Sequence, residues 1–272
     1  MTRRLSVYPI LALLNIFLIV SCSDDPSSAS SEPPALPPGT SMEMDFSSLL
    51  SSQNTESATS QDMNFYVQAV YKAGTLEGLI DGTLAKPRKL LAAARDTMGR
   101  LNKDQRWEWG YLHALNDVQY QSRLVAEQIA AKTVNWSLYV TVDSLDIRDQ
   151  LFFDGTTMND GTEGTWTFNL LSDGEEEAAK LNWELPGESS SDFFLELNIL
   201  SDGSDSDINY ITYAGEGQVR TVEFYNAASE TTSTIQWNTE NRSGFIIDPD
   251  VNDGEKACWD SELQDDLNCS RE

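Results

Sequence analysis

The chain has 272 residues, with 44 acidic and 18 basic side chains and a single histidine, so its formal net charge at pH 7 is −26. A charge of this sign opposes binding to nucleic acid and to anionic lipid headgroups, so we expect no nucleic-acid partner. One histidine cannot supply a His-x-x-x-His zinc motif, and the sequence contains no Gly-x-Ser-x-Gly nucleophile elbow. The common hydrolase signatures are therefore excluded.

The first residues are typical of a secretory signal. Arg3 and Arg4 precede an apolar run over residues 5–20, which ends next to Cys22. The run is interrupted by a proline and an asparagine, and it is shorter than the roughly 20 apolar residues of a membrane-spanning helix. In this position Cys22 resembles the lipobox cysteine of bacterial lipoproteins. The resemblance implies a signal peptide over residues 1–21, lipidation of Cys22 and a membrane partner reached through that lipid.

The residues after the cysteine bear on location. Ser23 is not the aspartate that often retains lipoproteins in the inner membrane, which favours the outer membrane. Ser23-Asp24-Asp25 also resembles the acidic export signal of Bacteroidota surface lipoproteins. We expect an outer-membrane lipoprotein displayed on the cell surface. The periplasmic face, cleavage by ordinary signal peptidase and an uncleaved anchor remain as alternatives.

Composition divides the rest of the chain. Residues 22–61 are rich in Ser and Pro and poor in apolar side chains, so we expect a lipidated, disordered tether. Residues 62–103 have apolar side chains at helical spacing, which predicts one helix over 62–85 capped by Asp62 and a second from Pro87 to about residue 98. Three glycines recur every fourth residue in this segment. We expect them to pack on a sheet, with a partner protein's helix as the alternative: Gly74, Gly78 and Gly82.

Residues 104–272 alternate between apolar and polar side chains, with turn residues at short intervals. This pattern predicts an antiparallel β domain, because the connections are too short for parallel crossovers. Residues 118–131 are compatible with a strand or a helix, and we choose a strand. The expected fold is α+β and mainly β: a meander of about ten strands, curled into a barrel or half-barrel and packed with one or two N-terminal helices. The expected strands are 107–111, 118–131, 136–142, 151–153, 166–170, 181–185, 193–200, 208–213, 219–225, 232–237 and 244–247.

Four motifs together resemble a group of uncharacterised Gram-negative, Bacteroidota-like lipoproteins. They are an apolar helix with a proline at Leu84 to Pro87, the Trp107-Glu108-Trp109 strand, the Glu163-Gly164-Thr165-Trp166 strand and a closing Cys258-Trp259-Asp260…Cys269. The resemblance covers about 200 residues. It implies a β-rich fold and no particular activity.

Two further candidate sites come from the residues themselves. Outside the cytoplasm a pair of cysteines left after lipidation usually bonds, so we expect a disulfide between Cys258 and Cys269, with two free thiols as the alternative. Asp248, Asp250 and Asn252 alternate oxygen-bearing side chains as the start of a calcium loop does. The segment departs from the EF-hand pattern because its glycine comes one place late and no glutamate follows at the twelfth position. A solvated acidic turn is the alternative to Ca²⁺ binding.

No motif names a reaction. We expect a lipid-anchored envelope or surface protein that acts as a non-catalytic binding or structural module, with no assigned catalytic residue. One alternative is a carrier that holds a lipid or other apolar ligand between helix and curved sheet, which requires an apolar cavity. The second alternative is a carbohydrate-active hydrolase, which requires a cleft with two carboxylates at a fixed separation.

Overall fold

The computed structural model describes residues 32–50, 64–171, 176–187, 191–201 and 204–269. It contains a short helix α1 (Ser47–Leu50), a long helix α2 (Phe65–Ala93) and four 3₁₀ turns at Gly39–Met42, Ala94–Asp96, Asp143–Leu145 and Asn252–Gly254. The strands are β1 Arg100–Leu101, β2 Trp107–Leu115, β3 Val118–Ala130, β4 Thr133–Val142, β5 Ile147–Met158, β6 Glu163–Asn169, β7 Glu177–Glu184, β8 Phe193–Ser201, β9 Ser204–Glu216, β10 Val219–Asn226, β11 Thr231–Asn238, β12 Gly244–Ile247, β13 Ala257–Trp259 and β14 Asp265–Asp266.

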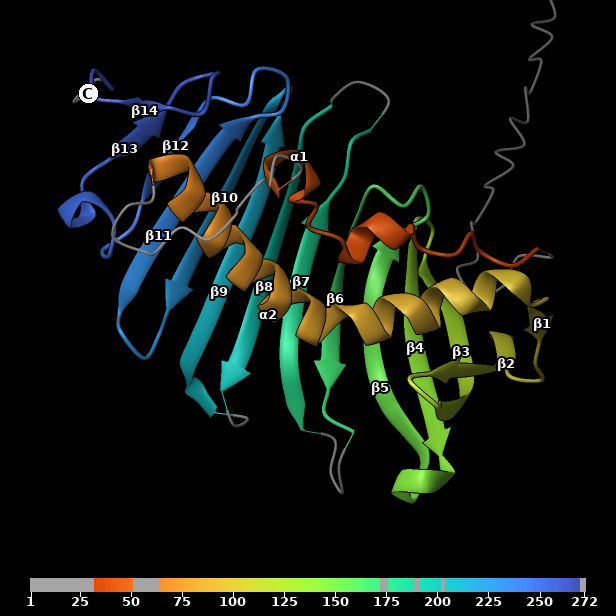
Figure 1. The fold of residues 1–272 in the computed structure, drawn as a ribbon. Helices are drawn as coiled ribbons and strands as arrows, with labels where there is room; N and C mark the ends of the chain where they lie inside the picture. The colour runs from red at the N-terminus through yellow and green to blue at the C-terminus, as the bar shows by residue number, and fades with distance from the viewer. Residues whose placement is uncertain (1–31, 51–63, 172–175, 188–190, 202–203, 270–272) are drawn as a thin grey trace, which may run out of the picture.

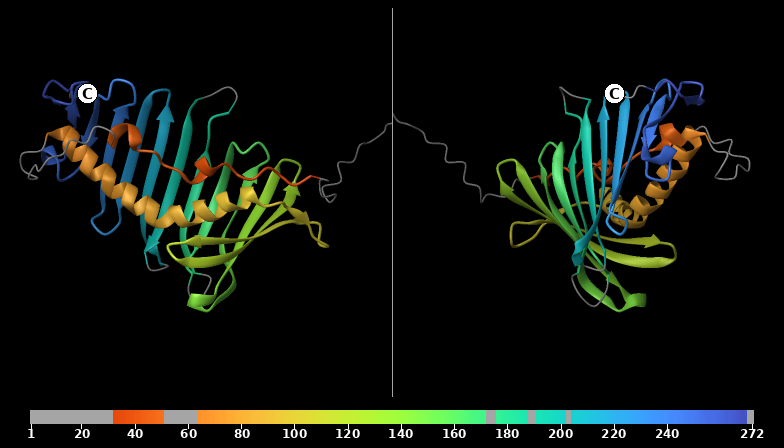
Figure 2. Two further views of the ribbon diagram at one scale, coloured as in Figure 1. Left: turned by 45° about the vertical axis from the view of Figure 1, so that its right-hand side comes forward. Right: turned by 90° about the vertical axis from the view of Figure 1, so that its left-hand side faces the viewer.

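All fourteen strands form a single antiparallel sheet in which each strand lies beside its neighbours in sequence. The predicted α+β, mainly β meander is confirmed, and residues 118–130 form a strand rather than a helix. The sheet is strongly twisted, but its first and last strands lie at opposite ends, so it is not closed into a barrel (Figures 1 and 2). The strands beyond the expected number are the short β1, β13 and β14 at these two ends.

One face of the sheet carries the core. Along β4, Val134, Trp136, Leu138 and Val140 are buried, and the residues between them are half-buried. This alternation places every second side chain on the same face. Helix α2 crosses that face and covers strands from both ends of the sheet (Figure 1).

Trp rings on the core face lie over glycines of the neighbouring strand. Gly155 pairs with Trp166, and Gly164 pairs with Trp183. A Cβ atom at Gly155 or Gly164 would lie only 2.7 or 2.6 Å from the partner ring. The glycines therefore make room for rings that lie close to the sheet, which leaves space above them for the covering segments.

Helix α2 is one continuous helix, so the predicted break at Pro87 is wrong. Proline removes one helical hydrogen bond, but Leu84 and Leu90, on either side of it, are fully buried on the same sheet. This shared burial keeps the two segments on one axis. The expected cap Asp62 lies outside the described residues. Instead, the Asn64 side chain accepts a hydrogen bond from the Val67 amide at 2.9 Å.

The three glycines of α2 lie on its exposed face, so the expectation that they pack on the sheet is wrong. A Cβ atom at Gly74, Gly78 or Gly82 would meet nothing within 4 Å. The buried face is formed instead by larger apolar residues that include Leu76 and Ile80. Their burial stabilises the fold by more than the close approach of a glycine ridge would.

The expected disordered tether over residues 22–61 is wrong for residues 32–50, whereas residues 22–31 and 51–61 lie outside the described parts. Residues 35–50, here called the strap, run along one end of the strands beside α2 (Figure 2). Met42 and Phe46 are fully buried, and Leu49 is nearly so. These large side chains add enough buried area to offset the ordering of a Ser- and Pro-rich segment.

Hydrogen bonds from the core hold the strap in place. The Trp166 indole donates to Ser41 Oγ at 3.3 Å, and the Trp237 indole donates to Ser48 Oγ at 2.9 Å. A buried indole N–H needs such an acceptor. The strap is therefore part of the folded core. Three further side chains donate to its backbone carbonyls: Tyr66 to Leu49, Tyr213 to Asp45 and Arg95 to Pro37.

Candidate functional site

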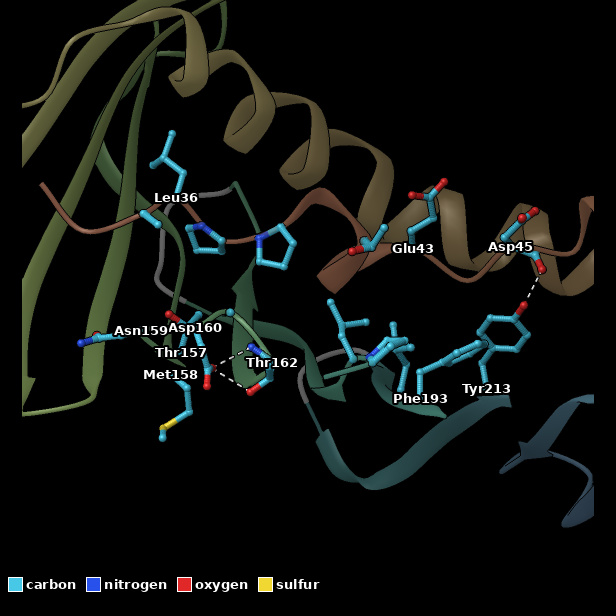
Figure 3. Close-up of a pocket in the computed structure, with 18 of the residues that line it drawn as sticks. Leu36, Glu43, Asp45, Thr157, Met158, Asn159, Asp160, Thr162, Phe193 and Tyr213 are labelled. Atoms are coloured by element: carbon cyan, nitrogen blue, oxygen red, sulfur yellow. Dashed lines mark hydrogen bonds between the residues drawn. The ribbon is translucent and has the colours of Figure 1, made fainter. Parts of the chain in front are cut away.

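A cleft of about 720 Å³ lies between the strap and one end of strands β5 to β10. Figure 3 shows Leu36, Glu43 and Asp45 on the strap side, opposite Asp160 and Phe193. The lining mixes apolar and charged groups. The apolar residues include Leu36, Pro38, Leu185, Pro186, Phe193 and Leu195, and the charged residues are Glu43, Asp45, Arg95, Asp160 and Arg220.

Arg220 provides the cation at one end of the cleft. Its guanidinium lies 5.0 Å from the centre of the Phe193 ring, and it donates hydrogen bonds to the carbonyls of Gly217 and Val219. β8 supplies the ring and β10 supplies the cation, and the two meet because both residues lie opposite Gly215 of β9, the strand between them. The stacked, hydrogen-bonded Arg220 is a preformed site for an anionic or hydrogen-bond-accepting group.

Tyr213 closes the floor of the cleft beside Arg220. Its hydroxyl donates a hydrogen bond to the carbonyl of Asp45 at 2.5 Å (Figure 3). Burial raises the pKa of Tyr213 to about 12; nearby Arg220 lowers it, whereas Asp45 raises it further. Tyr213 therefore stays protonated near neutral pH and serves as a fixed donor rather than as a base.

The opposite end of the cleft is the turn between β5 and β6. Asp160 accepts hydrogen bonds from both the hydroxyl and the amide of Thr162 (Figure 3). The hydroxyl bond is the largest of the effects that lower the pKa of Asp160, so the carboxylate stays ionised. The turn is thereby stiffened by a local side-chain bond.

The ionisable side chains of the cleft are carboxylates, arginines and a tyrosine. Its lining contains no histidine or cysteine, and His113 lies on β2, paired with Tyr120. Glu43 and Asp45 are exposed on the strap, so neither has the apolar surroundings that tune a general acid.

The chain matches no protein-family model, and neither the curated proteins nor the solved structures contain a significant match to it.

Asp248 has a different role from the predicted calcium ligand. Its side chain is only 3% exposed, and its Oδ2 accepts from Lys72 Nζ at 2.8 Å and from Ser233 Oγ at 2.7 Å. The amide of Asp250 donates to Oδ1 at 2.9 Å. Both carboxylate oxygens are thus engaged by donors, whereas calcium requires six to eight oxygen ligands that are free to coordinate it.

The other residues of that segment do not complete a cation site. Asn252 begins a 3₁₀ turn and has a positive φ of 50°, which asparagine tolerates. Over the described part of the chain, no three His, Cys, Asp or Glu side chains form a group that could hold a metal ion. Asp248 forms an ion pair with Lys72 of helix α2, and its bond to the Asp250 amide stabilises a turn.

The structure brings the sulfur atoms of Cys258 and Cys269 to bonding distance, with their Cα atoms 5.7 Å apart, in agreement with the predicted disulfide. Cys22 lies outside the described residues. Within those described ranges, no helix combines the length and the apolar character that a membrane crossing requires.

Sequence reasoning missed the cleft. The alternation places Phe193, Tyr213 and Arg220 on strands and indicates no binding role for them, and the composition of the strap predicts a tether. The usable signal was the spacing of Met42, Met44 and Phe46, which alternates as in a segment with one buried side.

Proposed function

We propose that this chain is a lipid-anchored protein of the outer cell envelope, displayed on the surface, that catalyses no reaction and binds a ligand at the strap cleft. The observation that supports it best is the filled core face of the sheet. Helix α2 and the strap occupy the position where a carrier would hold a lipid, and Met42, Phe46 and Leu84 are fully buried there. What remains is an open cleft with charged walls.

The cleft chemistry favours a ligand that has both charged and apolar parts. Phe193 and Leu195 offer apolar contact, and Arg220 can bind a carboxylate. Glu43 and Asp45 on the strap can bind an ammonium group. A short zwitterionic peptide provides these groups together.

The second candidate is a carrier of an apolar ligand. The observation in its favour is the cluster of apolar side chains along the cleft, including Leu36, Leu185 and Pro186. This site would hold an acyl chain against the strap rather than beneath helix α2.

Three probes distinguish the candidates: a zwitterionic tripeptide, palmitate and a neutral oligosaccharide, each added to the purified chain in a thermal-unfolding assay. A ligand that binds only the folded state raises the melting temperature. We expect the tripeptide to raise it for the wild type and for Arg148→Gln, an exposed arginine outside the cleft, but not for Arg220→Gln. A shift with palmitate alone would favour the carrier. No shift with any probe would rule out the cleft as a site for these ligand classes.

The anchor is tested separately in a Gram-negative host. Labelled palmitate should enter the wild type and Cys258→Ser but not Cys22→Ala, and membrane retention should follow the label. Protease treatment of intact cells should degrade the domain if it faces outward. Unlabelled wild-type chain would refute the anchor, and resistance to protease would place the domain on the periplasmic face.

A further inference from the structure

The turn between β3 and β4 has an exposed apolar tip. The tip is defined here as residues 129–132, in sequence Ile129, Ala130, Ala131 and Lys132, and all four side chains are exposed. Ile129 is 51% exposed, and the two residues that follow it are also apolar and exposed.

A β-bulge presents Ile129 to solvent. The register between β3 and β4 moves from Gln128 opposite Val134 to Ala130 opposite Thr133, so Ile129 is the extra residue between two paired positions. A bulge of this kind changes the direction in which a side chain points. The exposure of Ile129 is thus built into the backbone.

Three carbonyl groups of the tip, those of residues 130–132, already have hydrogen-bond donors. Asn159 donates from its amide to the Lys132 carbonyl at 2.9 Å and from Nδ2 to the Ala131 carbonyl at 3.2 Å. The Gln128 side chain donates to the carbonyls of Ala130 and Thr133. Unsatisfied carbonyls would make transfer to an apolar phase costly. These side chains reduce that cost before any contact forms.

The N-terminal part of the chain meets the domain next to this tip. Asn159 lies in the turn after β5, where a Cβ atom on Gly161 would be 3.3 Å from Pro38 of the strap. Nine residues lie between Cys22 and Glu32, the first described residue. Even fully extended, the ten steps from Cys22 to Glu32 span at most about 36 Å. A lipid on Cys22 therefore keeps this end of the domain close to the bilayer.

The charge of the tip also suits a lipid surface. The whole chain is strongly acidic, but Lys132 is the only charged residue of the tip, and it lies close enough to Asp160 to lower the pKa of that carboxyl. A lysine can bury its aliphatic stem and place its ammonium group among phosphates. Residues 129–132 thus contain no acidic side chain that an anionic lipid surface would repel.

From these observations we infer that residues 129–132 insert into the interfacial region of the phospholipid membrane that holds the chain. The inference rests on the proposed lipid anchor at Cys22. It adds an orientation: the β3–β4 turn and the strap side face the bilayer, and the opposite ends of these strands point away from it.

The test uses the full lipidated chain in vesicles of phosphatidylethanolamine with a minor fraction of phosphatidylglycerol. Ile129→Cys carries an environment-sensitive fluorophore, with Cys22 acylated and Cys258 and Cys269 paired. The matched control is Leu145→Cys, 56% exposed and beyond the far end of β4. We expect a blue shift and quenching by spin-labelled lipid at position 129, and a water-like signal at position 145.

The possible outcomes distinguish failure of the membrane-tip inference from failure of the lipid anchor at Cys22. If the chain floats with the vesicles but position 129 is as water-exposed as position 145, the membrane-tip inference is wrong and the anchor stands. If the chain does not float and its mass shows no acyl groups, the anchor itself fails. Shielding of position 129 before vesicles are added would show that another protein surface covers the tip, and would overturn the inference.

Discussion

The two halves of helix α2 are attached to the sheet by different kinds of interaction. The N-terminal half buries apolar side chains on the sheet as the rest of the helix does, and polar groups hold it in addition: Phe65 donates its amide to Asp265, and Lys72 pairs with the buried Asp248. The C-terminal half is held mainly by apolar burial, with Leu84 and Leu90 fully inaccessible. The attachment of the first half should therefore respond to pH and to reduction of the nearby Cys258–Cys269 disulfide as well as to side-chain volume, whereas that of the second should respond mainly to side-chain volume.

The largest expected effect is in the C-terminal half. Leu84→Ala removes a fully buried side chain between helix and sheet. We expect a loss of about 3 kcal/mol in the free energy of unfolding, measured by urea denaturation. The control is Leu79→Ala on the exposed face of the same helix, 37% exposed, which should change stability by less than about 1 kcal/mol. Equal effects would mean that α2 is not seated on the sheet as described.

The next effect concerns the disulfide near the helix N-terminus. Cys258 and Cys269 flank a segment that binds the N-terminus of α2. In this segment the Leu263 carbonyl accepts a hydrogen bond from the Asn64 side chain, and the Asp265 side chain accepts one from the Phe65 amide. We expect Cys258→Ser with Cys269→Ser to cost about 3 kcal/mol at most. Hydrogen exchange should rise in residues 64–72 and stay unchanged in residues 84–93. A uniform rise would contradict the difference between the halves.

The ion pair should give a smaller, pH-dependent effect. Burial raises the pKa of Asp248, but hydrogen bonds from Lys72 and Ser233 outweigh it, so the net pKa is lowered. A lowered pKa means that ionised Asp248 stabilises the fold above the ordinary aspartate value and that this contribution is lost as pH falls through the folded-state pKa. Asp248→Asn should cost about 1–3 kcal/mol near neutral pH.

Unfolding free energies measured from neutral pH down to about pH 2 test this sign, because the range passes below the ordinary aspartate pKa. The difference between wild type and Asp248→Asn should shrink toward the acid end. Asp81→Asn is the control, since Asp81 pairs with Arg88 at the surface and is 55% exposed. A constant difference across the range would show that the effect does not come from the charge of Asp248.

The local patterns of the sequence are sufficient to predict the strands but not the contacts between segments that lie far apart in the chain. Alternation along residues 136–142 predicted β4, because the period of two is a property of the strand itself. The acids at 248 and 250 resembled a metal loop because their local spacing does not reveal Lys72, which reaches Asp248 from the other end of the chain. The cleft was unpredictable for the same reason, since the strap, β8 and β10 form it together.

The smallest effect concerns the glycines on the exposed face of α2, between its two attachments. Glycine in a helix interior is less favourable than alanine by about 1 kcal/mol. A Cβ atom at Gly78 would meet nothing within 4 Å, so Gly78→Ala should raise the free energy of unfolding by up to that amount. Gly164→Ala is the opposite case, because its Cβ atom would lie 2.6 Å from the Trp183 ring and should lower stability. Thermal unfolding of the two purified variants and of the wild type measures both stability changes. A destabilising Gly78→Ala would mean that this face of α2 is covered in solution, and it would extend the comparison from the two ends of the helix to its outer surface.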